Sequence, residues 1–179
     1  MKPALKMAEK LGWTMCCLVI SACQPTLNWR EVQIDNTSVR VMLPCKPDKS
    51  ARNVPLGGQE VAMQLLNCTA GGFTFAVSGA QLPPGTSAQV ALSHWRRSTL
   101  AHLKVAEAVP ATVLPTGILF ATGTRPDGGA VALAAQWVTR GQSVVQLAIY
   151  VDNPQGELAQ DRLKPDVYEA FFDGLRFQP

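Results

Sequence analysis

Two histidines and two cysteines are the side chains of this 179-residue chain best suited to metal binding. His94 and His102 lie eight residues apart on a segment with helical spacing, about 12 Å along a helix axis, so they cannot bind one metal ion without a bend. Cys45 and Cys68 have no histidine within 25 residues, and a zinc site needs more ligands than these two thiols supply. We therefore expect no metal site, and we expect the two histidines to be exposed.

Motifs of known enzymes are missing from the sequence. There is no Gly-x-Ser-x-Gly, no His-Glu-x-x-His and no phosphate-binding glycine loop, and Ser78 is followed by Gly79 but has no glycine two residues before it. Carboxylate pairs brought together from distant segments remain possible. We expect no catalytic residue and no cofactor, and therefore a protein that is not an enzyme.

Two further sets of side chains have alternative interpretations. Arg96 and Arg97 could meet phosphate or lipid headgroups, although a solvated helix flank is the favoured interpretation. Trp95 and Trp137 could line a ligand cavity, although plain packing in the core is favoured for them.

The first 22 residues have the pattern of a secretory signal. Lys2, Lys6 and Lys10 precede an uncharged run, Leu11–Ala22, which is too short to span a bilayer because a helix needs about 20 residues. A basic region, a short apolar region and small residues at its end are typical of a signal peptide. We expect residues 1–22 to be removed, and we exclude them from the fold.

The end of this segment, Ile20-Ser21-Ala22-Cys23, resembles the lipobox of bacterial envelope lipoproteins. The resemblance implies that the Cys23 thiol is joined to a diacylglycerol, that the chain is cut before Cys23, and that two or more acyl chains anchor it stably. Lipoproteins that are retained at the inner membrane carry Asp directly after the lipidated cysteine. This chain has Gln24 there, which implies sorting to the outer membrane. The alternative is an ordinary signal peptide with an incidental cysteine. Cys16 and Cys17 are poorer lipidation sites because no small residue precedes them.

The rest of the chain has the composition of one globular domain. It carries 13 basic and 12 acidic residues, and the whole chain is 47% hydrophobic and 16% charged, which excludes a disordered chain and a strongly basic nucleic-acid binder. We expect residues 23–29 to form a short tether and residues 30–179 a single domain. Trp29, within this tether, could touch the membrane interface or pack on the domain.

A secreted domain encounters an oxidising compartment, so the sequence predicts a disulfide between Cys45 and Cys68. Each cysteine ends a predicted strand, and we expect the bond to join neighbouring strands. The enclosed loop of about 23 residues corresponds to roughly 3.4 kcal/mol of stabilisation in the chain-entropy account. The spacing is not that of a Cys-x-x-Cys redox pair.

Alternating apolar residues predict an α+β fold: an antiparallel β-sheet with one long and one short C-terminal helix packed on it. The long helix is expected from a cap at Thr86 or Ser87 to about Lys104, and the short one from Pro165 to Gly174. Residues 46–58 are expected to be a loop or irregular edge, and residues 153–163 a loop. Strands are predicted at residues 32–34, 39–43, 61–69, 73–82, 105–114, 117–124, 130–139 and 143–151.

The two faces of this sheet differ in side-chain size. One is expected to carry Phe, Leu, Ile, Val and Trp as the main core, and the other Ala, Ser, Thr and Gly. The small-residue face permits close approach of a helix or a partner, but half-exposure is the favoured interpretation.

The order of elements, with an early strand that ends in Leu43-Pro44-Cys45-Lys46-Pro47, resembles the PsbP-like α/β sandwich group. Members of that group mostly assist larger assemblies, and the resemblance implies no catalytic residue. We therefore expect a lipid-anchored periplasmic lipoprotein of the outer membrane that binds or stabilises another envelope component, with an envelope protein as its partner and neither metal nor nucleic acid. The alternatives are a carrier of a lipid or small apolar ligand and, third, a hydrolase without a recognisable motif.

Overall fold

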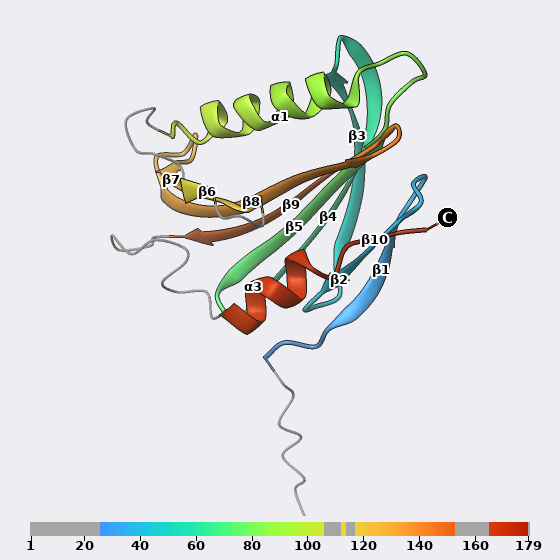
Figure 1. Cartoon of the computed structure of the whole chain (residues 1–179). Coiled ribbons are helices and arrows are strands. Elements are labelled where there is room, and N and C mark those ends of the chain that lie inside the picture. The colour runs from blue at the N-terminus through green and yellow to red at the C-terminus, as the bar shows by residue number, and fades with distance from the viewer. Residues whose placement is uncertain (1–25, 106–111, 114–116, 153–164, 179) are drawn as a thin grey trace, which may run out of the picture.

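Antiparallel strands make up most of the chain and form two sheets (Figure 1). The computed structural model describes residues 26–105, 112–113, 117–152 and 165–178. The small sheet has the order β1-β2-β10, and the large sheet has the order β3-β4-β5-β9-β8-β7-β6. The strands are β1 (Arg30–Ile34), β2 (Val39–Leu43), β3 (Asp48–Leu56), β4 (Gln59–Ala70), β5 (Phe73–Gln81), β6 (Thr112–Val113), β7 (Leu119–Thr124), β8 (Ala130–Arg140), β9 (Ser143–Asp152) and β10 (Arg176–Phe177).

Two helices cover opposite faces of the large sheet. Helix α1 (Ala88–His102) lies on one face, and α3 (Pro165–Phe172) lies with the small sheet on the other (Figure 1). The main core lies between the large sheet, the small sheet and α3, and it contains Phe75, Phe171 and Ile34 with no exposed surface. The predicted α+β class with antiparallel pairing is therefore confirmed.

Helix α1 begins where the sequence places its cap. Pro83, Pro84 and Gly85 end the preceding strand region, and the Ser87 side chain accepts a hydrogen bond from the backbone N–H of Val90 at 3.4 Å. Such a cap satisfies one of the N–H groups that the first helical turn leaves free. The helix buries Ala91 and Leu92 against the sheet.

Residues 48–56 are a regular strand, so the prediction of a loop or irregular edge over residues 46–58 is wrong. Gly57 and Gly58 have positive φ values of 64° and 80° and make a two-residue turn between β3 and β4. In such a hairpin alternate residues direct their N–H groups away from the partner strand. Pro55 occupies an outward position, where its missing N–H removes no ladder bond.

The small-residue face of the sheet is covered rather than half-exposed. On β5 and β9, Ala80, Ala148 and Ser78 are buried on the α1 side, where Leu92 and Trp95 of the helix pack. Small side chains allow the helix backbone to approach the sheet closely.

The expected sorting of large and small residues onto opposite faces also fails at β8. Leu133 and Trp137 face α1, while Ala132 and Ala134 face the main core. On the main-core face, small residues of β8 thus lie beside large residues of β9, as in the pairs Ala132–Val151 and Ala134–Ile149. The two strands thus place their large side chains on opposite faces of the sheet, with those of β8 toward α1 and those of β9 toward the main core.

The chain ends in a strand that periodicity did not predict. β10 is two residues long and pairs with β2, so a second sheet forms where one sheet was expected. Only residues 112–113 of the strand expected at 105–114 appear as a strand in the described part, and the polar segment 153–163 lies outside the described residues.

Gly123 on β7 lies close to the backbone at the end of α1, and a substitution at this position tests how α1 packs on the sheet. A Cβ at this position would overlap the carbonyl oxygen of Leu103, which accepts a hydrogen bond from the Thr124 N–H. We expect Gly123→Ala to lower the free energy of unfolding by about 1–3 kcal/mol in urea titrations, because a backbone atom must move. The control is Gly129→Ala, whose nearest neighbour is the mobile side-chain oxygen of Asp127 at 3.3 Å. Equal effects of the two substitutions would contradict this packing.

Candidate functional site

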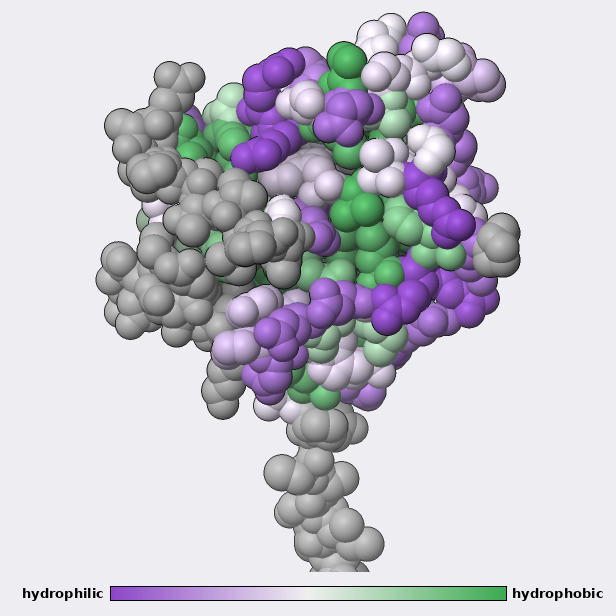
Figure 2. Space-filling view, viewed as in Figure 1, coloured by the Kyte–Doolittle hydropathy of each residue, from purple (hydrophilic) through white to green (hydrophobic). Residues whose placement is uncertain are grey.

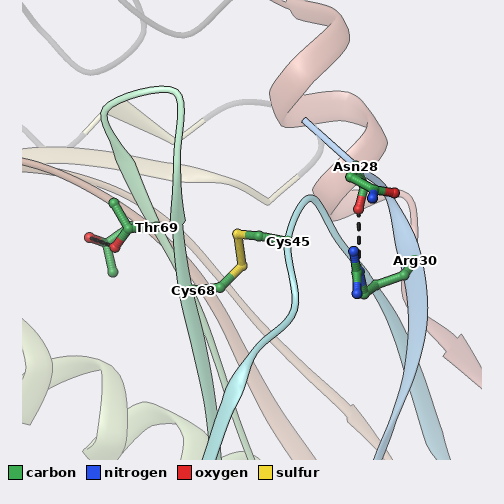
Figure 3. Close-up of a disulfide and its surroundings, with 6 residues drawn as sticks. Asn28, Arg30, Cys45, Cys68 and Thr69 are labelled. Carbon is green, nitrogen blue, oxygen red and sulfur yellow. Dashed lines mark hydrogen bonds between the residues drawn. A yellow bond between two sulfur atoms is a disulfide. The ribbon is translucent and has the colours of Figure 1, made fainter. Parts of the chain in front are cut away.

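The predicted disulfide is present, and it joins the two sheets. Cys45 lies in the connection from β2 to β3, and Cys68 lies on β4 of the large sheet, with Cα atoms 5.9 Å apart and sulfur atoms 2.03 Å apart (Figure 3). The bond was expected to join neighbouring strands, but β2 and β4 belong to different sheets. The disulfide therefore holds the small sheet over the main core.

The described chain already packs on the domain before β1 begins. The Asn28 N–H donates to the Pro44 carbonyl at 2.7 Å, and the Trp29 ring meets Phe75 edge-on at 6.2 Å. Of the two interpretations of Trp29, the structure supports packing on the domain. Part of the expected tether thus belongs to the folded surface, while Cys23 and the rest of the lipobox lie outside the described residues.

Helix α1 presents an unbalanced set of cations to solvent. Arg96, Arg97 and Lys104 are exposed, as are His94 and His102, and α1 itself contains no acidic residue. Within residues 26–105, 117–152 and 165–178, neither arginine takes part in an ion pair. In that same part of the chain no group of three potential metal ligands occurs.

Among the described residues, Tyr150 is the titratable group whose surroundings shift its pKa. Burial on the α1 side of β9 raises the pKa of its phenol, and the nearby Arg125 guanidinium opposes that rise. Arg125 is itself held by an ion pair with Asp152. Burial of Tyr150 thus favours the protonated phenol over the phenolate.

Two open clefts border α1. The first, about 560 Å³, lies at the start of the helix and is lined by Gly57, Gln59, Pro83, Pro84, Gly85, Thr86, Ser87 and Val90. The second, about 310 Å³, lies between the helix and β8 and is lined by Gln89, Leu92, Ser93, Arg96, Gly117, Trp137, Val138 and Thr139.

The second cleft borders a stretch of β8 that has no outer neighbour among the described strands. β7 pairs with β8 only as far as Ala135, whereas β9 pairs with it to Arg140. Figure 2 shows hydrophobic residues in a hollow between hydrophilic bands, at the height of β8 and β9. The Trp137 indole N–H is buried and has no hydrogen-bond partner among the described residues.

The sequence located only part of this cleft. Trp137, named as a possible cavity-lining residue, does line it, whereas Trp95 packs between α1 and the sheet. Arg96 borders the cleft, and Arg97 does not line it. The open edge was missed, although the predicted strand at residues 117–124 is shorter than the one at 130–139 that it pairs with.

Comparisons of this chain with protein-family models, curated proteins and solved structures find no match. None of the helices in the described residues is long and apolar enough to cross a membrane.

Removal of the disulfide tests its role in holding the two sheets together. We expect the double substitution Cys45→Ala and Cys68→Ala to lower the free energy of unfolding by about 3 kcal/mol, because the unfolded chain regains the freedom of the 23-residue loop. Reductant should destabilise the unsubstituted protein similarly and leave the double variant unchanged. An unaltered urea midpoint in the double variant would show that the bond contributes nothing.

The acidity of Tyr150 can be measured by ultraviolet titration of Tyr168→Phe, which leaves it as the only tyrosine. We expect ionisation above the usual pKa of about 10, and a further rise in Arg125→Gln, which removes the opposing charge. Because the folded pKa is raised, the associated stability is present below pH 10 and is lost as the pH rises toward the folded value. A pKa at or below 10 would contradict the burial of this phenol.

Proposed function

We propose that this protein is a lipid-anchored lipoprotein of the bacterial cell envelope, held in the outer membrane through Cys23 with its domain in the periplasm. The observation that carries the proposal is the sequence Ile20-Ser21-Ala22-Cys23 directly after a basic and then apolar segment. The anchored domain binds or stabilises another envelope protein and is not an enzyme.

The disulfide supports the choice of compartment. Structural disulfides persist in the periplasm and are rare in the cytosol, and the Cys45–Cys68 bond joins two buried sheets rather than a redox motif. The early attachment of the chain supports a membrane-proximal domain. Asn28, which hydrogen-bonds to Pro44 of the domain, lies five residues after Cys23, so the chain between Cys23 and this contact spans at most about 18 Å.

A binding role is favoured by the surface of the domain. The cleft between α1 and β8 combines an open strand edge with the exposed Arg96 and the partly buried Trp137 and Val138, which suit a protein ligand. The resemblance to the PsbP-like group, rooted in strand order and Leu43-Pro44-Cys45-Lys46-Pro47, favours the same role. A carrier of an apolar molecule is less favoured, because α1 already covers the small-residue sheet face that suggested one.

Substitution of the lipidation site tests the anchor. We expect Cys23→Ala to carry no acyl chain, to keep residues 1–22 and to be lost from the outer-membrane fraction, because no thiol is available to receive the diacylglycerol. The matched control is Cys17→Ala, which should fractionate with the outer membrane and begin at an acylated Cys23 by intact mass. Outer-membrane association of Cys23→Ala equal to that of the control would overturn the proposed anchor.

A further inference from the structure

The second half of β8 has backbone groups available for another strand. Gly141 and Gln142 make a two-residue turn, so Arg140 pairs with Ser143 and alternate residues turn their backbone N–H and C=O toward β9 or away from it. Leu133 and Ala135 use the outward positions to pair with β7. Trp137 and Thr139 are the next two outward positions, and β8 has no outer strand beside them in the described part of the chain.

This edge lies in a hollow rather than on a flat surface. α1 borders it on one side with Leu92, Ser93 and Arg96, in the cleft of about 310 Å³. On the other side Val138 packs against the main core, and the Arg140 guanidinium lies over the Phe177 ring at 5.8 Å. An added strand would therefore bury alternate side chains against α1 and against the β10 side (Figure 2).

The charges around the hollow favour an acidic ligand. Arg96 lines the cleft, Arg97 lies one residue further along α1, and no carboxylate is among the residues that line the cleft. Arg140 ends the β8 edge, where its guanidinium donates a hydrogen bond to the Phe177 carbonyl at 3.2 Å. In the described residues none of these arginines forms an ion pair. The same cleft on a second copy of this chain carries Arg96 and no carboxylate, so it does not complement this charge.

We propose that the Trp137–Arg140 edge of β8 binds an extended, acidic peptide segment of a partner protein as an added antiparallel or parallel strand. Backbone hydrogen bonds at Trp137 and Thr139 supply affinity, and carboxylates paired with Arg96 and Arg140 supply selectivity. The inference rests on the proposed function, because it names the surface and the kind of partner for that binding role.

The test uses the full-length mature protein in detergent, so that binding is measured separately from anchoring. The probes are fluorescein-labelled ten-residue peptides that alternate valine with glutamate, and valine with lysine. A third probe has the valine–glutamate sequence with alternate amides N-methylated, which cannot extend a sheet. Binding is followed by fluorescence anisotropy, and hydrogen exchange reports protection of the Trp137 and Thr139 amides.

We expect the glutamate peptide to bind at least about tenfold more tightly than the lysine and N-methylated peptides and to protect both amides. Thr139→Pro removes an outward N–H without removing a bond to β9 and should weaken binding by about tenfold or more. Asn53→Pro places the same change at an outward position of β3, outside the cleft, and should leave binding unchanged.

Three outcomes would overturn the proposal. The first is equal binding of the glutamate and N-methylated peptides, and the second is no protection of the two amides at saturating peptide. The third is protection that rises with protein concentration alone, which would assign the edge to a second copy. None of these depends on Cys23, so the anchor is judged separately by the fractionation of Cys23→Ala.

Discussion

Strand β9 is buried along nearly its whole length, and its two faces enter different cores. Leu147 and Ile149 point into the core shared with α3, whereas Val144 and Ala148 point toward α1. A strand that is apolar on both faces cannot meet water on either, so the sheet requires a cover on each side. α1 supplies one cover, and the small sheet with α3 supplies the other. The Cys45–Cys68 bond reinforces the second cover, which is built from the two ends of the chain.

The two edges of the large sheet carry different kinds of residue, and this difference favours a binding function for the β8 edge. β3 is exposed over most of its length, but it carries Lys49, Arg52 and Pro55, the residue types that prevent edge-to-edge association. The open half of β8 carries Trp137 and Val138 in a hollow instead. Arg96 is the charged side chain that lines the cleft, and α1 beside it obstructs a broad sheet-to-sheet contact.

Local patterns predicted the elements better than their assembly. The cap at Ser87 and the proline at Pro165 each act on neighbouring residues, and each marks the start of a helix in the structure. The β3 strand was missed because its exposed polar residues show no alternation, and β10 because two residues carry no period. The candidate cleft exists because β7 stops pairing with β8 at Ala135. The point at which one strand stops along its neighbour is a long-range property, and the spacing of residues along the chain does not predict it. Trp137 could be named as a cleft residue, but not the edge beside it.

In the proposed anchored state, the position of the tether decides what α1 can reach. The described chain begins on the side of α3 and the small sheet, and α1 lies across the large sheet from it (Figure 1). Packed layers are spaced by about 10 Å, so α1 lies roughly 20 Å from the small-sheet side. A tether of about 18 Å is shorter than this separation, so it favours an orientation in which α1 faces away from the membrane that holds the domain. In that orientation Arg96 and Arg97 lie away from the headgroups, and their charges, with the β8 edge beside them, are free for a partner in the periplasm.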